Sequence, residues 1–126
     1  MLKVIAVLLA ALIVLLGLAV FQNIRSASAP VFKTPYQAVV LTGGQVYYGK
    51  LENPTGMYPV LRDIFYVVTK QDPQTKQVSN VLVRRGKELH SPEYMVLNRQ
   101  SILFVEPVKE DSEIGKSIGE QKRQSK

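Results

Sequence analysis

The first part of the chain is uniformly hydrophobic, and the pattern changes completely after it. Val4–Phe21 is a run of 18 residues without a charged or hydrogen-bonding side chain. A helix rises about 1.5 Å per residue, so this run reaches about 27 Å, close to the thickness of a bilayer core. A helix that is apolar on all sides has no polar face to turn toward water. The pattern predicts a transmembrane anchor over residues 1–21, with the lipid bilayer contacting Val4 to Phe21.

A cleaved secretory signal is the alternative for this segment. Lys3 supplies a positive amino end, and Ala27-Ser28-Ala29 matches a small-residue cleavage pattern. The apolar run is longer than the roughly 7 to 15 residues of a signal, and the motif lies well beyond its end. We therefore expect an uncleaved anchor. Basic residues flank both sides of the run, and we expect the short amino end on the inner, cytoplasmic side of the membrane and the rest of the chain on the outer side.

Residues 22–35 mix small polar residues with two prolines, which disfavour helix, and this composition predicts an extended linker. The apolar period then changes to that of strands. Tyr36–Leu41 and Gln45–Leu51 are rich in β-branched and aromatic residues, and Gly43-Gly44 between them predicts a two-residue hairpin turn.

Four further strands are predicted after a type I turn at Asn53-Pro54-Thr55-Gly56. They are Val60–Lys70, Val78–Arg84, Tyr94–Leu97 and Ile102–Pro107. No convincing 3.6-residue apolar repeat occurs between Pro30 and Pro107. The pattern predicts an all-β unit over residues 36–107.

The strand Val60–Lys70 carries large apolar side chains on both faces. Strict alternation puts Leu61, Phe65 and Val67 on one face, and Ile64, Tyr66 and Val68 on the other. In a chain this short, such a strand favours a small, strongly curved barrel of about five antiparallel strands. The surplus apolar groups make Tyr48, Ile64, Tyr66 and Val68 candidate contacts with a second copy or another protein.

The tail, residues 108–126, is polar apart from Ile114 and Ile118, which are one helical turn apart. Gly115 and Gly119 each weaken a helix by about 1 kcal/mol. The tail predicts at most one frayed helix followed by disorder.

Two segments resemble the motifs of Sm-like proteins. Val39 to Leu51 is an apolar strand, a Gly turn, and a second strand with Gly49 and Leu51 two apart. Met95 to Val105 is similar to the second motif, in which two short strands flank a polar turn containing an Arg, here Arg99. The resemblance, which SH3-type barrels share in part, implies a five-stranded barrel that commonly forms rings.

The RNA-binding function of that family is not implied. Where Sm-like proteins place an Asp and an Asn that hold bases, this chain has Thr55-Gly56-Met57-Tyr58-Pro59, and Arg99 is followed by Gln100 rather than Gly. The whole layout also resembles uncharacterised single-pass envelope proteins of bacteria. That likeness implies a cytoplasmic-membrane location and brings no activity with it.

Charge and composition narrow the functional classes. The chain carries a net charge of +6, but the basic residues are spread over all three regions rather than gathered in a stripe. The densest basic group supplies the candidate anion or nucleic-acid contacts Arg84, Arg85 and Lys87, together with Arg99. A membrane-tethered nucleic-acid-binding protein is therefore the alternative function, although the scattered charge disfavours a nucleic-acid partner.

No catalytic constellation is evident in the sequence. There is no cysteine, and the single histidine, His90, lies in a turn-like loop. Glu52 and Asp63 could meet across strands as a carboxylate pair, but salt bridges with Lys50 or Arg62 are the more ordinary role. We expect no enzyme activity, no cofactor and no metal site. The leading hypothesis is a membrane-anchored interaction or assembly module of the cell envelope that forms homo-oligomers or binds another envelope protein.

Overall fold

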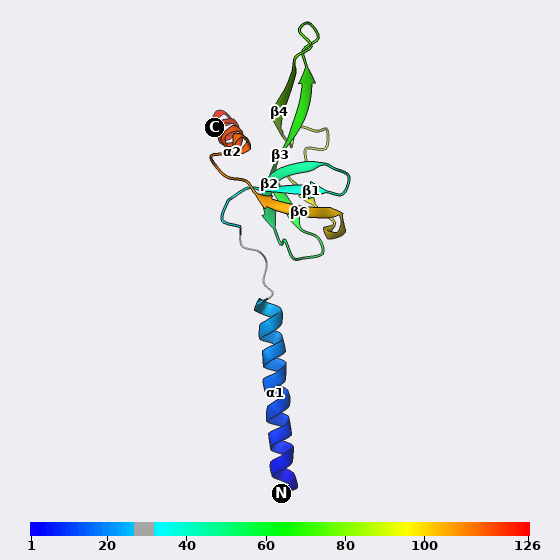
Figure 1. Ribbon diagram of the computed structural model, residues 1–126, viewed down its shortest axis with the longest axis vertical. Coiled ribbons are helices and arrows are strands. Elements are labelled where there is room, and N and C mark those ends of the chain that lie inside the picture. Colours follow the sequence, from blue (N-terminus) through cyan, green and yellow to red (C-terminus); the bar gives the residue numbers. More distant parts are fainter. Residues whose placement is uncertain (27–31) are drawn as a thin grey trace. The chain divides into compact units, whose positions relative to one another are not determined.

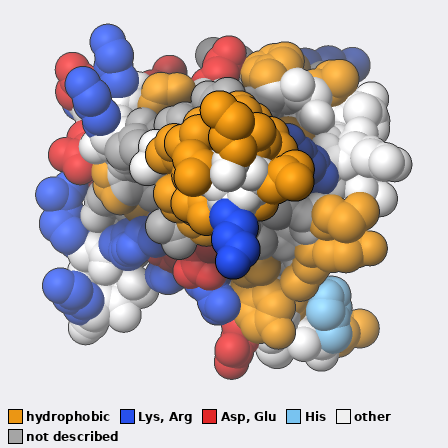
Figure 2. All heavy atoms as spheres, turned by 90° about the horizontal axis from the view of Figure 1, so that it is seen from below, with side chains coloured by type: hydrophobic (Ala, Val, Ile, Leu, Met, Phe, Trp, Pro, Cys, Tyr) orange, Lys and Arg blue, Asp and Glu red, His pale blue; other side chains and the backbone are white. Residues whose placement is uncertain are grey.

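The computed structural model describes residues 1–26 and 32–126, which form an amino-terminal helix and a separate β-rich unit. Helix α1 (Leu2–Ser26) has 25 residues, and none of its span Leu2–Gln22 is buried. Figure 2, which looks at the molecule from the amino-terminal end of α1, shows hydrophobic side chains gathered around this helix. Within the described residues, α1 is the one helix long and apolar enough to cross a membrane.

The helix extends beyond the predicted end of the anchor at residue 21. The end of the apolar run at Phe21 predicts a linker from Gln22 onward, but residues 22–26 continue the helix to Ser26. Polar side chains do not stop a helix, and the first proline of the chain is Pro30. The remainder of the linker over residues 27–31, including Ala27-Ser28-Ala29, lies outside the described residues.

The β-rich unit is one antiparallel sheet with a carboxy-terminal helix beside it (Figure 1). Its strands are β1 (Gln37–Leu41), β2 (Val46–Glu52), β3 (Val60–Gln71), β4 (Val78–Arg84), β5 (Tyr94–Val96) and β6 (Ile102–Pro107). The hydrogen-bonded order is β4-β3-β2-β1-β6, and β5 pairs with the beginning of β3. A short 3₁₀ helix, η1 (Arg99–Ser101), connects β5 to β6.

The predicted fold class, an apolar helix followed by a mostly antiparallel β unit, is confirmed. The predicted barrel is only loosely supported. Within residues 32–126 no ladder joins β5 to β6, so the sheet does not close. The outer halves of β3 and β4 run beyond the rest of the sheet as a two-stranded arm (Figure 1). We call residues 66–83, which include the loop between the two strands, the β3–β4 arm.

The β1–β2 turn is longer than the predicted two-residue hairpin. The amide of Gly44 donates to the carbonyl of Leu41, and the amide of Leu41 donates to the carbonyl of Gln45. Only Gly44 of the two glycines has a positive φ, 85°. This is the arrangement of a type I turn followed by a left-handed residue, which needs one glycine rather than two.

An irregularity at Asp63 overturns the predicted faces of β3. Lys50 pairs with Arg62 but Tyr48 pairs with Phe65, so β3 has one residue more than β2 at this point. Asp63 has a φ of 51°, in the left-handed region that Asp tolerates better than most residues. The extra residue reverses the alternation. Leu61 and Ile64 therefore share one face, and Phe65 faces the other way.

The sheet consequently has an apolar core on each of its two faces. The interior core, inside the bend of the sheet, is Val39, Leu61, Ile64 and Leu97. The outer core, between the sheet and the carboxy-terminal helix, is Tyr36, Ala38, Phe65, Val108 and Ile118.

Helix α2 (Glu113–Gln124) occupies most of the segment where a frayed helix and disorder were predicted. Ser112 caps it by accepting a hydrogen bond from the amide of Gly115 at 3.0 Å. Ile118 is only 2% exposed and packs in the outer core, so tertiary packing supplies the stability that the isolated segment lacks. A Cβ on Gly115 would lie 2.2 Å from the carbonyl oxygen of Lys109. Gly115 therefore allows the start of α2 to approach the preceding loop closely.

Candidate functional site

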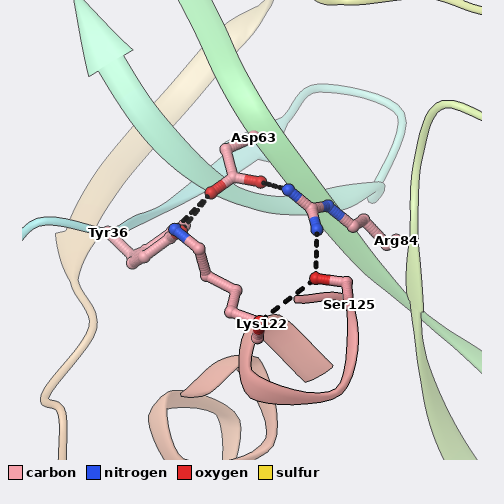
Figure 3. Close-up of polar contacts among 5 residues, drawn as sticks. All are labelled: Tyr36, Asp63, Arg84, Lys122 and Ser125. Carbon is pink, nitrogen blue, oxygen red and sulfur yellow. Dashed lines mark hydrogen bonds and ion pairs between the residues drawn. The ribbon is translucent and has the colours of Figure 1, made fainter. Parts of the chain in front are cut away.

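The main polar cluster of the β-rich unit is built around Asp63 (Figure 3). One carboxylate oxygen, Oδ2, accepts from the hydroxyl of Tyr36 and from Nζ of Lys122 at 2.9 Å. The other, Oδ1, accepts from Nη2 of Arg84 at 2.7 Å. Nζ of Lys122 also donates to the Tyr36 hydroxyl at 2.8 Å. The cluster thus joins the bulge in β3, the end of β4, the residue before β1, and α2.

The contacts fix the protonation states of the cluster. Burial alone would raise the pKa of Asp63, but the hydrogen bonds from Tyr36 and Lys122 and the charge of Arg84 lower this pKa below its usual value. Burial, together with the hydrogen bond to Asp63, raises the pKa of Tyr36. The hydrogen bonds to Tyr36 and Asp63 raise the pKa of Lys122. At neutral pH the site therefore holds an ionised carboxylate, a protonated amine and a neutral phenol.

This arrangement holds separate elements of the unit together. Both oxygens of Asp63 are engaged by internal donors, and its side chain is only 15% exposed. Nε2 of Gln121 adds a bond of 2.7 Å to the carbonyl of Leu82, and Arg84 reaches Ser125 at 3.5 Å. The last turns of α2 are thereby fastened to β4. We call Tyr36, Asp63, Arg84 and Lys122 the helix latch.

The four basic residues proposed as anion contacts do not form one free group. Arg84 is engaged by Asp63, and Nη1 of Arg99 donates to the carbonyl of Thr55 at 2.7 Å. Nε of Arg85 is buried without a hydrogen-bond partner among the described residues, whereas Lys87 is exposed. Arg84 and Arg85 line a hollow of about 350 Å³, but two acidic residues, Asp63 and Glu93, line it as well. Nucleic-acid binding stays an untested prediction.

The four residues proposed as partner contacts are separated by the fold. Ile64 is 4% exposed and belongs to the interior core, because the irregularity at Asp63 turns it inward. It therefore does not contribute to the surface. Tyr48 is half-buried against the outer core. Tyr66 and Val68 are half-buried on the β3–β4 arm, and the ring of Tyr66 meets that of Tyr47 edge to face at 6.3 Å.

An open apolar groove lies next to the outer core. It has a volume of about 610 Å³, and the sheet and the approach to α2 line it. The apolar residues at its walls include Val40, Val46, Tyr48, Phe104 and Ile114. Phe104 is 49% exposed, and its neighbour Leu103 is 59% exposed. We call this feature the sheet groove.

The remaining candidate side chains have ordinary surroundings. His90 is exposed in the loop between β4 and β5. Glu52 binds Arg62 at 2.9 Å, as the salt-bridge alternative predicted, while Asp63 belongs to the helix latch. In residues 1–26 and 32–126 no three His, Asp or Glu side chains are placed together to hold a metal ion.

No sequence motif identifies the residues of the helix latch. Lys122 is 59 residues from Asp63, in a tail of mixed charges, and no motif distinguishes it from its neighbours. One hint was available: Ile114 and Ile118 fall on one face of a helix, which needs an apolar surface to cover it.

Comparisons with known proteins leave the chain without an assigned family. No protein-family model and no curated protein matches it. The likeness to Sm-like and SH3-type barrels therefore rests on the strand pattern and the bent antiparallel sheet alone.

Proposed function

We propose that this protein is a non-enzymatic, membrane-anchored interaction module whose β-rich unit binds another copy of itself or another envelope protein. The observation that carries the proposal is the apolar surface left uncovered on the sheet. Phe104 of β6 is 49% exposed and lines the sheet groove together with Val40, Val46 and Tyr48. A contiguous exposed apolar patch on a small protein commonly marks a protein contact, because covering it removes apolar surface from water.

The proposed location is the cytoplasmic membrane of a bacterium, with α1 crossing the bilayer, the amino terminus inside and the β-rich unit outside. The length and composition of α1 support the membrane part of this proposal. The orientation is part of this proposal, and a reporter fused after Lys126 tests it. Activity of that reporter only in the cytoplasm would reverse the orientation.

Cross-linking of the full-length chain in cells, followed by identification of the captured proteins, tests the interaction. The informative variant is Phe104→Glu, which places a charge in the sheet groove. The matched control is Leu89→Glu, because Leu89 is fully exposed in the loop before β5. We expect Phe104→Glu to reduce the captured material severalfold and Leu89→Glu to leave it unchanged. Capture that is equal for both variants, or no capture by the parent chain, would contradict the proposal.

A further inference from the structure

The outer edge of β4, in the β3–β4 arm, has no strand paired with it among the described residues. β4 is the terminal strand of the sheet order, and only β3 pairs with it among residues 32–126. All the residues from Thr69 to Asn80 are exposed, and Val78 is 64% exposed. A two-stranded ribbon of this kind has little stability by itself, and its second edge can accept another strand.

The register determines which backbone groups point to that edge. The amide of Asp72 donates to the carbonyl of Gln77, and the amide of Arg85 donates to the carbonyl of Ile64. Between these two bonds the β3–β4 ladder has no irregularity, and in an antiparallel ladder alternate residues face the partner strand. Val78, Asn80 and Leu82 therefore direct their backbone groups away from β3. The bond from Gln121 to the Leu82 carbonyl agrees with this assignment.

The edge lacks the features that usually prevent strands from pairing. Val78 to Val83 reads Val-Ser-Asn-Val-Leu-Val, with no charge, no proline and no glycine. Edge strands of soluble proteins are normally interrupted by such residues or covered by another element. Here the end of α2 reaches the strand at Leu82, through Gln121, and at Arg84, through Ser125.

We propose that β4 pairs with β4 of a second copy in an antiparallel, two-fold arrangement with Asn80 opposite Asn80. This inference rests on the proposed self-association and names its surface. Val78 of each copy then lies opposite Leu82 of the other, so two apolar pairs flank the central one. Asn80 forms the central hydrogen-bonded pair with its counterpart, and the Val78–Leu82 pairs beside it are completed when Gln121 releases the Leu82 carbonyl.

The side chains of this register favour a second copy as the partner. Oδ1 of Asn80 accepts from the Thr69 hydroxyl at 3.2 Å, which orients the amide and leaves its NH₂ group to bond the other copy's Asn80. Lys76 of one copy comes opposite Arg84 of the other, outside the five paired residues, and Asp63 offsets only part of the Arg84 charge because its carboxylate also pairs with Lys122. The strand is thus complementary to itself, and uncharged over the part that pairs.

The membrane anchor makes so small an interface sufficient. A stable interface in solution usually buries about 1,200–2,000 Å², more than a five-residue strand pair provides. Two copies held in one bilayer by α1 meet at a much higher effective concentration than they do in solution. The pairing is therefore a property of the anchored chain.

Cysteine cross-linking tests the register directly, because the chain has no cysteine. Opposed residues in a hydrogen-bonded antiparallel pair have Cα atoms about 5.5 Å apart, within the range of a disulfide. In the full-length chain reconstituted in lipid vesicles, we expect Asn80→Cys to give a disulfide-linked dimer under mild oxidation. The control Gln74→Cys, in the exposed loop at the tip of the arm, should give severalfold less dimer. Equal yields from the two variants would overturn the proposal.

A second test, with charged residues at position 80, distinguishes the proposed pairing from disulfides that form in random collisions. Asn80→Lys and Asn80→Asp each place two like charges directly opposite each other in the proposed pair. Association of labelled full-length chains in vesicles, measured by energy transfer, should therefore fall severalfold for each variant. Mixing the two variants should restore the signal, whereas Gln74→Lys should have no effect. Association that persists in Asn80→Lys but is lost in Phe104→Glu would overturn the β4 pairing and leave the proposed function standing. No association of the parent chain would overturn the pairing and its premise of self-association.

Discussion

The two cores on opposite faces of one sheet are built on different principles. The interior core consists of aliphatic side chains from two strands, β1 and β3, and from Leu97, which follows β5, and Val39 and Leu61 are completely buried. The outer core joins the sheet and its flanking residues to the buried Ile118 of α2, with Ile114 packed against it, and the helix latch lies beside it. The interior core holds the sheet in its bend, whereas the outer core attaches a helix to a sheet that already exists. The two sides of the sheet can therefore lose their structure separately.

The largest effect is expected from Leu61→Ala, in the interior core. Removing the buried side chain should cost about 2–5 kcal/mol of unfolding free energy, because lost burial and a residual cavity add together. Denaturant unfolding of the full-length chain in detergent measures this, with Leu89→Ala at an exposed position as the control. A change of less than about 1 kcal/mol for Leu61→Ala would mean that the sheet does not depend on this core.

A smaller and more local effect is expected from Ile118→Ala in the outer core. The substitution should detach α2 while the sheet stays folded, since no other side chain of α2 is fully buried. Hydrogen exchange should rise at least tenfold in residues 113–124 and stay nearly constant in β1 and β3. Equal acceleration in the sheet and the helix would show that the two cores unfold as one unit.

Alanine substitutions at the two glycines of α2 should change the stability of the docked helix in opposite directions. A Cβ at Gly119 meets nothing within 4 Å, so Gly119→Ala should stabilise the docked helix by up to about 1 kcal/mol. A Cβ at Gly115 would collide with the Lys109 carbonyl, so Gly115→Ala should destabilise it by about 1–3 kcal/mol. Hydrogen exchange in α2 measures both. The same sign for the two variants would contradict the close approach at Gly115.

The smallest effect is the pH dependence of α2 docking. The lowered pKa of Asp63 contributes stability above its ordinary value of about 4, and this stability is lost as the pH falls through the lower folded pKa. The raised pKa values of Tyr36 and Lys122 contribute stability that is lost as the pH rises above about 10. Docking of α2 should therefore be strongest between these limits. Asp63→Asn should flatten the acid side of the profile, and an unchanged acid limb would remove Asp63 from the latch.

The strands could largely be predicted because their signals are local. Alternation over Val78–Arg84 and Ile102–Pro107 gives the bounds observed, and the type I turn closes with the predicted bond from Gly56 to Asn53. The irregularity at Asp63 could not be predicted, because an Asp in a strand is compatible with either φ. That single residue decided whether Ile64 or Phe65 faces inward, and therefore which of the candidate contacts are at the surface.

The sequence by itself determined the apolar helix, the antiparallel β class and the absence of cysteine chemistry, because each depends on composition or on a period of a few residues. Only the tertiary structure decided that the polar tail becomes a docked helix and that Lys122 meets Asp63. Those outcomes depend on contacts between residues far apart in the chain, whose energy exists only after the sheet has formed. The edge position of β4 also follows from the tertiary structure, since it depends on which strands lie beside one another in the sheet.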